Sequence, residues 1–84
     1  MSELMELLYD YAREHGLSRY INQEDYQQLE DLESKSLSSL CRSLSAAQAE
    51  ALETYQHTSY GQKQLELEAM FQAGFEVALK LHTL

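Results

Sequence analysis

The sequence predicts an all-α protein built from three helices, and three observations support that prediction. Apolar residues recur at three- and four-residue spacing along every long stretch, Leu, Glu, Gln and Ala are abundant, and the 84 residues include no Pro. A chain of this length fits one domain, residues 1–84. We expect an antiparallel helical hairpin preceded by an N-terminal helix.

The first helix is expected over about residues 3–15. Ser2 is a suitable N-cap, and Gly16 is the kind of residue that ends a helix in the left-handed conformation. The predicted buried face consists of Leu4, Leu7, Leu8, Tyr11 and Ala12. Residues 17–21 are interpreted as a connector that packs back on the core.

The second helix is expected over about residues 23–43. Asn22 can cap its start, and the macrodipole favours Glu24 and Asp25 in its first turn. Its apolar positions are Tyr26, Leu29, Leu32, Leu37, Leu40, Cys41 and Leu44. Because Cys41 lies on this face, it is interpreted as a small buried hydrophobe.

The third helix is expected over about residues 46–82. Ser45 and Gln48 form an S-x-x-Q capping box, and Leu44 and Ala49 occupy the staple positions around it. Residues 57–61 are poor helix formers, but they contain no Pro, so the pattern allows one helix or two. We expect a helix kinked near Gly61.

The end of this helix is apolar around nearly its whole circumference. A single polar stripe interrupts it, formed by Gln64, Glu68, Gln72, Glu76 and Lys80. Two neighbouring helices cannot enclose such a helix, so we expect a homodimer through residues 65–84. The predicted interface consists of Leu67, Met70, Phe71, Gly74, Phe75, Val77, Ala78 and Leu81. The small Gly74 and Ala78 suit either a close dimer contact or packing within the chain.

Six tyrosines are available for packing or for binding. Tyr11 and Tyr26 fall on the predicted core faces and are interpreted as structural. Tyr9 and Tyr60 do not, and are the better interface candidates.

No pattern for catalysis, a metal or a cofactor is present, and we expect a protein that is not an enzyme. The three histidines are not spaced to place two ligands on one helical face, and no nucleotide-binding or hydrolase motif occurs. We expect a cytoplasmic protein, because there is one Cys, no membrane span and no basic, apolar leader at the start.

The net charge of −8 is concentrated in residues 1–33, which carry nine acidic and two basic residues. Such a surface disfavours direct nucleic-acid binding and leaves a basic protein as a possible partner. The alternative function is therefore a small acidic inhibitor of phage or mobile-element origin, of the anti-defence or nucleic-acid-mimic type, that blocks the basic groove of a host nucleic-acid enzyme. Its acidic face would be Glu24, Asp25, Glu30, Asp31 and Glu33. A toxin or antitoxin component is equally compatible with the size.

Residues 68–81 contain the pattern F-x-x-G-F-x-x-small, carried by Phe71, Gly74, Phe75 and Ala78. With Leu44-Ser45 opening a helix, the stretch resembles the C-terminal half of an uncharacterised family of short all-helical proteins from Gram-positive bacteria and phage-like elements. Glu76 departs from the basic residue usual there, and Ala78 replaces a second Gly. The resemblance implies an all-helical fold and a bacterial or phage setting; the family has no assigned activity, so it implies nothing about function.

Overall fold

The structure, a computed structural model, describes residues 1–83; residue 84, which ends the predicted interface segment, lies outside them. The described chain is helical almost throughout and contains no strand, so the all-α prediction is confirmed. In chain order the elements are α1 (Glu3–Tyr11), the π-helical turn η1 (Ala12–Gly16), α2 (Leu17–Tyr20), α3 (Gln23–Arg42) and α4 (Ala46–His82).

The N-terminal helix is longer than predicted. It starts as expected, with the Met5 backbone N–H donating to Ser2 Oγ at 3.2 Å. Gly16 does not end it: its φ of −93° and ψ of −36° are right-handed helical. The backbone instead widens by one residue, so that the Leu17 N–H donates to the Ala12 carbonyl five residues earlier. Residues 17–20 are thus a further helical turn and not a connector.

The starts of α3 and α4 are both capped by the predicted residues. Asn22 Oδ1 accepts from the Asp25 backbone N–H at 3.1 Å. At the next turn, Ser45 Oγ accepts from the Gln48 N–H at 3.2 Å, and Gln48 Oε1 accepts from the Ser45 N–H at 2.9 Å. This reciprocal capping box is confirmed, and it fixes the point at which the chain reverses.

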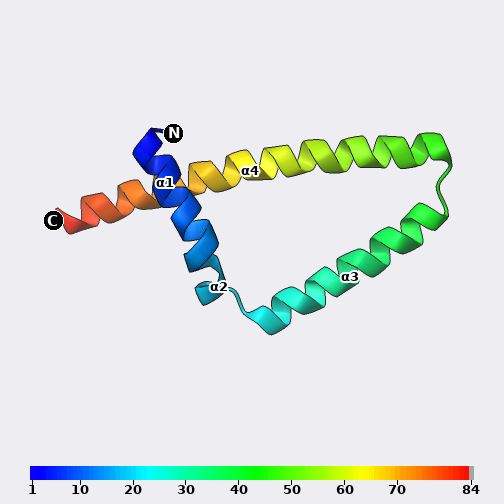
Figure 1. The fold of residues 1–84 in the computed structure, drawn as a ribbon, viewed down its shortest axis with the longest axis horizontal. Helices are drawn as coiled ribbons and strands as arrows, with labels where there is room; N and C mark the ends of the chain where they lie inside the picture. Colours follow the sequence, from blue (N-terminus) through cyan, green and yellow to red (C-terminus); the bar gives the residue numbers. More distant parts are fainter. Residues whose placement is uncertain (84) are drawn as a thin grey trace.

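Helix α4 runs unbroken through the stretch predicted to kink. Thr54 and Thr58 donate their hydroxyls to carbonyls four residues earlier, at 3.1 and 2.9 Å, so these poor helix formers are satisfied within the helix. Gly61 keeps helical geometry with no positive φ. Figure 1 shows no sharp bend there, so the expected kink does not occur.

The three helices form an open triangle (Figure 1). Helix α3 leaves the turn at residues 43–45 and diverges from α4, while α1 crosses α4 in the C-terminal part of that helix. The hairpin predicted for α3 and α4 is therefore splayed. The Cα radius of gyration is 17.7 Å, against about 12 Å for a compact chain of this length.

Such an arrangement leaves almost no interior. Tyr9 is the only buried apolar residue among those the structure describes. Tyr11 and Tyr26, predicted to be in the core, are 67% and 51% exposed, and Cys41 is exposed rather than buried. These predictions are wrong because no neighbouring helix covers Tyr11 on α1, or Tyr26 and Cys41 on the α3 region.

Gly61→Ala should stabilise the protein. An added Cβ meets no atom within 4 Å, and replacing Gly in a helix interior gains about 1 kcal/mol in the free energy of unfolding. Urea unfolding followed by circular dichroism, at fixed protein concentration, measures the change. The reverse substitution at an exposed position of the same helix, Ala51→Gly, should cost a similar amount. A destabilised Gly61→Ala protein would contradict the regular helix at this point.

Candidate protein-interaction site

Among residues 1–83, the one buried large side chain, Tyr9, lies where α1 crosses α4. The Tyr9 ring meets the Phe71 ring edge-on, with centroids 5.5 Å apart, and Phe75 stacks on Phe71 at 6.5 Å. Edge-to-face contacts of this kind add to the free energy gained from burial. The crossing therefore places the N-terminal helix on α4.

A charged residue closes the outer side of this contact. The Arg13 guanidinium lies 5.9 Å from the centre of the Tyr9 ring, within range of a cation–π interaction. The same side chain pairs with Asp10 at 3.7 Å. A groove beside the crossing is lined by Tyr9, Ala12, Arg13, Leu17, Gln64, Leu67 and Phe71. Its lining is mainly apolar and suits packing rather than chemistry.

The face of α1 that packs includes only Leu8 and Ala12 of the five predicted positions. The half-buried or buried positions are Met5, Leu8, Tyr9 and Ala12, spaced as one side of a helix. Leu4, Leu7 and Tyr11 form a second apolar stripe and stay exposed. The sequence did not indicate that Tyr9 is buried within the chain, because both stripes have helical spacing. Nothing in the sequence decides which stripe a neighbouring helix covers.

The predicted interface of α4 divides into two groups. Phe71 and Phe75 are half-buried where α1 crosses. The other six residues form a free face, which we call the α4 end face: Leu67, Met70, Gly74, Val77, Ala78 and Leu81. Its larger side chains are 53–72% exposed. The predicted interface is thus a continuous apolar surface, minus the two aromatic residues that hold α1.

The polar stripe of α4 is only partly in solvent. Gln64 and Glu68 are half-buried near the crossing and line a pocket with Tyr9 and Arg13. Further along, Glu76 and Lys80 form the predicted ion pair at 3.1 Å on the surface. Exposed pairs of this kind contribute little to stability.

The five acidic residues proposed as an alternative face do not share one side of α3. All are exposed. The helical period places Glu24 beside Asp31 and Glu30 beside Glu33, on different sides of the helix, with Asp25 on a third. The negative charge therefore surrounds the N-terminal half of α3.

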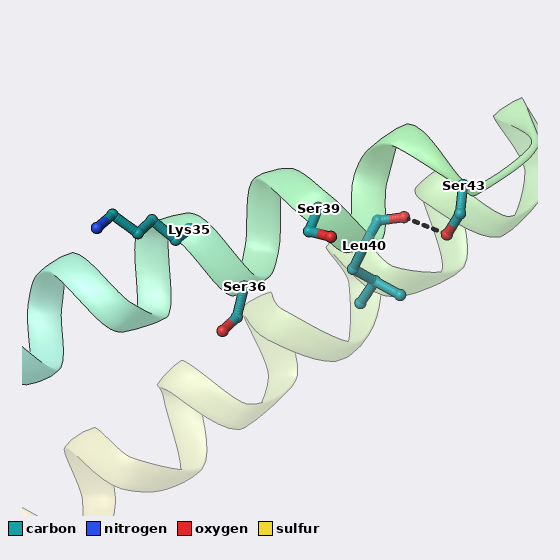
Figure 2. A pocket seen from close by; sticks show the side chains of 5 residues that line it. All are labelled: Lys35, Ser36, Ser39, Leu40 and Ser43. Atoms are coloured by element: carbon teal, nitrogen blue, oxygen red, sulfur yellow. Dashed lines mark hydrogen bonds between the residues drawn. The ribbon is translucent and has the colours of Figure 1, made fainter.

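Residues 1–83 contain no candidate metal site. No group of three or more His, Cys, Asp or Glu side chains there could hold a metal ion. Figure 2 shows a shallow depression lined by Lys35, Ser36, Ser39, Leu40 and Ser43, in which Ser43 Oγ donates to the Leu40 carbonyl at 2.8 Å. All five residues come from α3 and its C-cap, so the depression is the surface of one helix.

Comparison with family models, curated proteins and solved structures gives no match for this chain. The resemblance to short helical bacterial and phage proteins therefore stays an interpretation of the sequence. In the described part of the chain, none of the helices combines the length and apolar character needed to cross a bilayer.

Tyr9→Ala should release α1 from α4. The substitution removes the buried ring and its contact with Phe71, which should lower the free energy of opening α1 by about 3 kcal/mol. Hydrogen exchange of the α1 amides measures this opening. Tyr20→Ala, which truncates a side chain that is 85% exposed, is the control and should change it by less than about 0.5 kcal/mol. If the α1 amides exchange equally fast in the two variants, the Tyr9 contact does not hold α1 on α4.

Proposed function

We propose that the chain is a non-enzymatic helical interaction module that forms a homodimer through residues 65–84 and acts by binding a protein partner. The observation that supports it is the exposed surface. The chain exposes 7546 Å², whereas a compact protein of 9.7 kDa exposes roughly 5,100 Å². The excess is about 2,400 Å² per chain, which is the scale of an obligate homodimer interface.

The apolar composition of this excess surface points to burial rather than to hydration. Eighteen large apolar side chains are exposed in the part of the chain that the structure describes. Soluble monomers rarely leave contiguous apolar patches of this kind uncovered, because each Å² of apolar surface removed from water gains about 25 cal/mol. A second copy supplies the missing neighbour without requiring any other molecule.

The α4 end face is the best place for that contact. Leu67, Met70 and Val77 project there with more than half of their surface exposed. An added Cβ at Gly74 meets nothing within 4 Å, so the backbone is open to close approach at this point. A helix seated on this face would pack closely against α4.

The proposal extends to the setting of the protein. A single exposed thiol, Cys41, is suited to the reducing cytosol, where we place the chain. The resemblance at Phe71 to Phe75 supports a bacterial or phage-element origin. In this setting the module would act by occupying a surface of its partner.

The second candidate is the acidic inhibitor of a basic groove. The exposure of the acidic residues on α3 favours it. Their distribution around the helix does not, because a nucleic-acid mimic presents its charges to one groove. Salt dependence separates the two functions: a contact made by carboxylates weakens steeply between low and moderate ionic strength, and a contact made by the α4 end face hardly changes.

Val77→Glu should dissociate the homodimer. A symmetric interface would bury the unpaired carboxylate twice, which should raise the dimer dissociation constant by roughly a hundredfold or more. Light scattering after gel filtration should give twice 9.7 kDa for the wild type and 9.7 kDa for the variant at micromolar concentration.

Gln72→Glu is the matched control, because it adds the same charge on the polar stripe of the same helix. It should leave the dimer intact. A wild-type protein that is monomeric at micromolar concentration, with residues 65–84 protected from exchange, would overturn the proposed dimer.

A further inference from the structure

We infer that the α4 end face of one copy packs, antiparallel, between α3 and α4 of the second copy. This inference rests on the proposed homodimer and names the surface of the partner that receives the α4 end face. That surface, which we call the wedge surface, consists of Tyr26, Leu29, Leu37, Leu40 and Leu44 of the α3 region together with Ala49 and Leu52 of α4.

The α3 part of the wedge surface is uncovered. Tyr26, Leu29 and Leu40 are 51%, 66% and 45% exposed, although the helical period places them on one side of α3. Only Leu37 and Leu44, towards the turn, are half-buried. An amphipathic helix of 20 residues with so little of its apolar side covered requires a partner for it.

The α4 part of the wedge surface lies on the same side of α4 as the α4 end face, with Gln56, Ser59 and Lys63 between the two. Ala49 lies 18 residues before Leu67, and Leu52 lies 18 residues before Met70, which is five turns at 3.6 residues per turn. On this side of α4, Ala49 and Leu52 near the turn are half-buried, whereas Leu67 and Met70 further along are exposed. A twofold axis across the middle of α4 therefore brings the free half of one helix onto the wedge surface of the other, in both directions.

The N-terminal helix sets the opening of the wedge at the end away from the turn. From Tyr9, where it is anchored on α4, to Tyr20, where it approaches α3, the helix spans about 16 Å. Two helices that flank a third lie roughly 16–20 Å apart, since packed helices are 8–10 Å apart.

Charge complementarity selects the antiparallel orientation. Lys63 lies near the middle of α4, on the same side as the α4 end face, and forms no ion pair within residues 1–83. Glu66 follows three residues later in the same helix. Antiparallel pairing about this point brings each Lys63 towards Glu66 of the second copy, whereas parallel pairing would place the two Lys63 side chains together.

The excess exposed area of each chain is also larger than a contact through the α4 end face alone would bury. The excess of about 2,400 Å² per chain is three times the roughly 800 Å² that each partner contributes to an interface of standard size. Covering the wedge surface in the same contact accounts for the additional area.

A cross-linking experiment tests the arrangement, using Cys41 as a native probe. Wild-type protein is mixed with a Cys41→Ser/Ala78→Cys variant, so that each chain carries one thiol, and a short bis-maleimide reagent is added. Within one chain, residue 78 lies about 48 Å along α4 from the turn beside Cys41, too far for the reagent. The expected product is a link between Cys41 of one copy and residue 78 of the other, identified by mass spectrometry.

The matched control places the thiol in the middle of α4 as Cys41→Ser/Gln62→Cys, which should give at least tenfold less product. A wild-type product joining Cys41 to Cys41 would indicate parallel pairing and overturn the inference. So would equal yields from residues 62 and 78, or the absence of any product from a sample shown to be dimeric.

A pair of substitutions on α3 distinguishes this inference from the proposed dimer. Leu29→Glu lies on the wedge surface, and Gln28→Glu adds the same charge on the other side of the helix. We expect Leu29→Glu to give the monomer mass and Gln28→Glu to stay dimeric. If Val77→Glu dissociates the dimer and Leu29→Glu leaves it intact with full helicity, the homodimer stands and the wedge as its receiving surface is wrong. If Leu29→Glu unfolds the chain, the cross-linking of the wild type with the Cys41→Ser/Ala78→Cys variant decides whether the wedge surface receives the α4 end face.

Discussion

The contact between Tyr9 and Phe71 is the constraint on which the rest of the tertiary arrangement depends. It ties the N-terminal helix to α4 at a point far from the turn that joins α3 to α4. Because the N-terminal helix continues through Gly16 to Tyr20, it acts as a rigid strut between that anchor and the start of α3. Helix α3 therefore cannot lie along α4, and the apolar sides of both helices remain uncovered. A chain that ended its first helix at Gly16 would be free to close the hairpin.

The local structure could be predicted from the sequence, since its causes are local. Caps at Ser2, Asn22 and Ser45 each act within a few residues, and the structure places α3 within one residue of the predicted bounds. Gly16 shows the limit of this reasoning. Glycine permits a left-handed helix end but does not require it, and here the backbone satisfies its carbonyls through a π turn. The same holds at Gly61, where no neighbouring segment bends the helix.

The choice between apolar faces could not be predicted, because it depends on contacts between distant segments. Helix α1 carries two apolar stripes, and α4 is apolar around most of its circumference, so the spacing of residues allows several packings. The sequence placed Tyr11 in a core and Tyr9 at an interface, and the structure reverses the two. Of the residues predicted as the interface of α4, all are exposed except Phe71 and Phe75, where α1 crosses; their role as an interface stays a prediction.

Helices that are capped and internally satisfied do not by themselves specify one tertiary fold. Most helical stability in proteins comes from packing an apolar side of the helix against a neighbour rather than from helix propensity. In the proposed dimer that packing is intermolecular, so folding and association become one equilibrium that depends on protein concentration. The charge of −8 per chain opposes this association at long range, and salt screens that repulsion. An apolar self-contact in an acidic protein should thus be strengthened slightly by salt, whereas an acidic inhibitor bound to a basic groove would lose affinity under the same conditions.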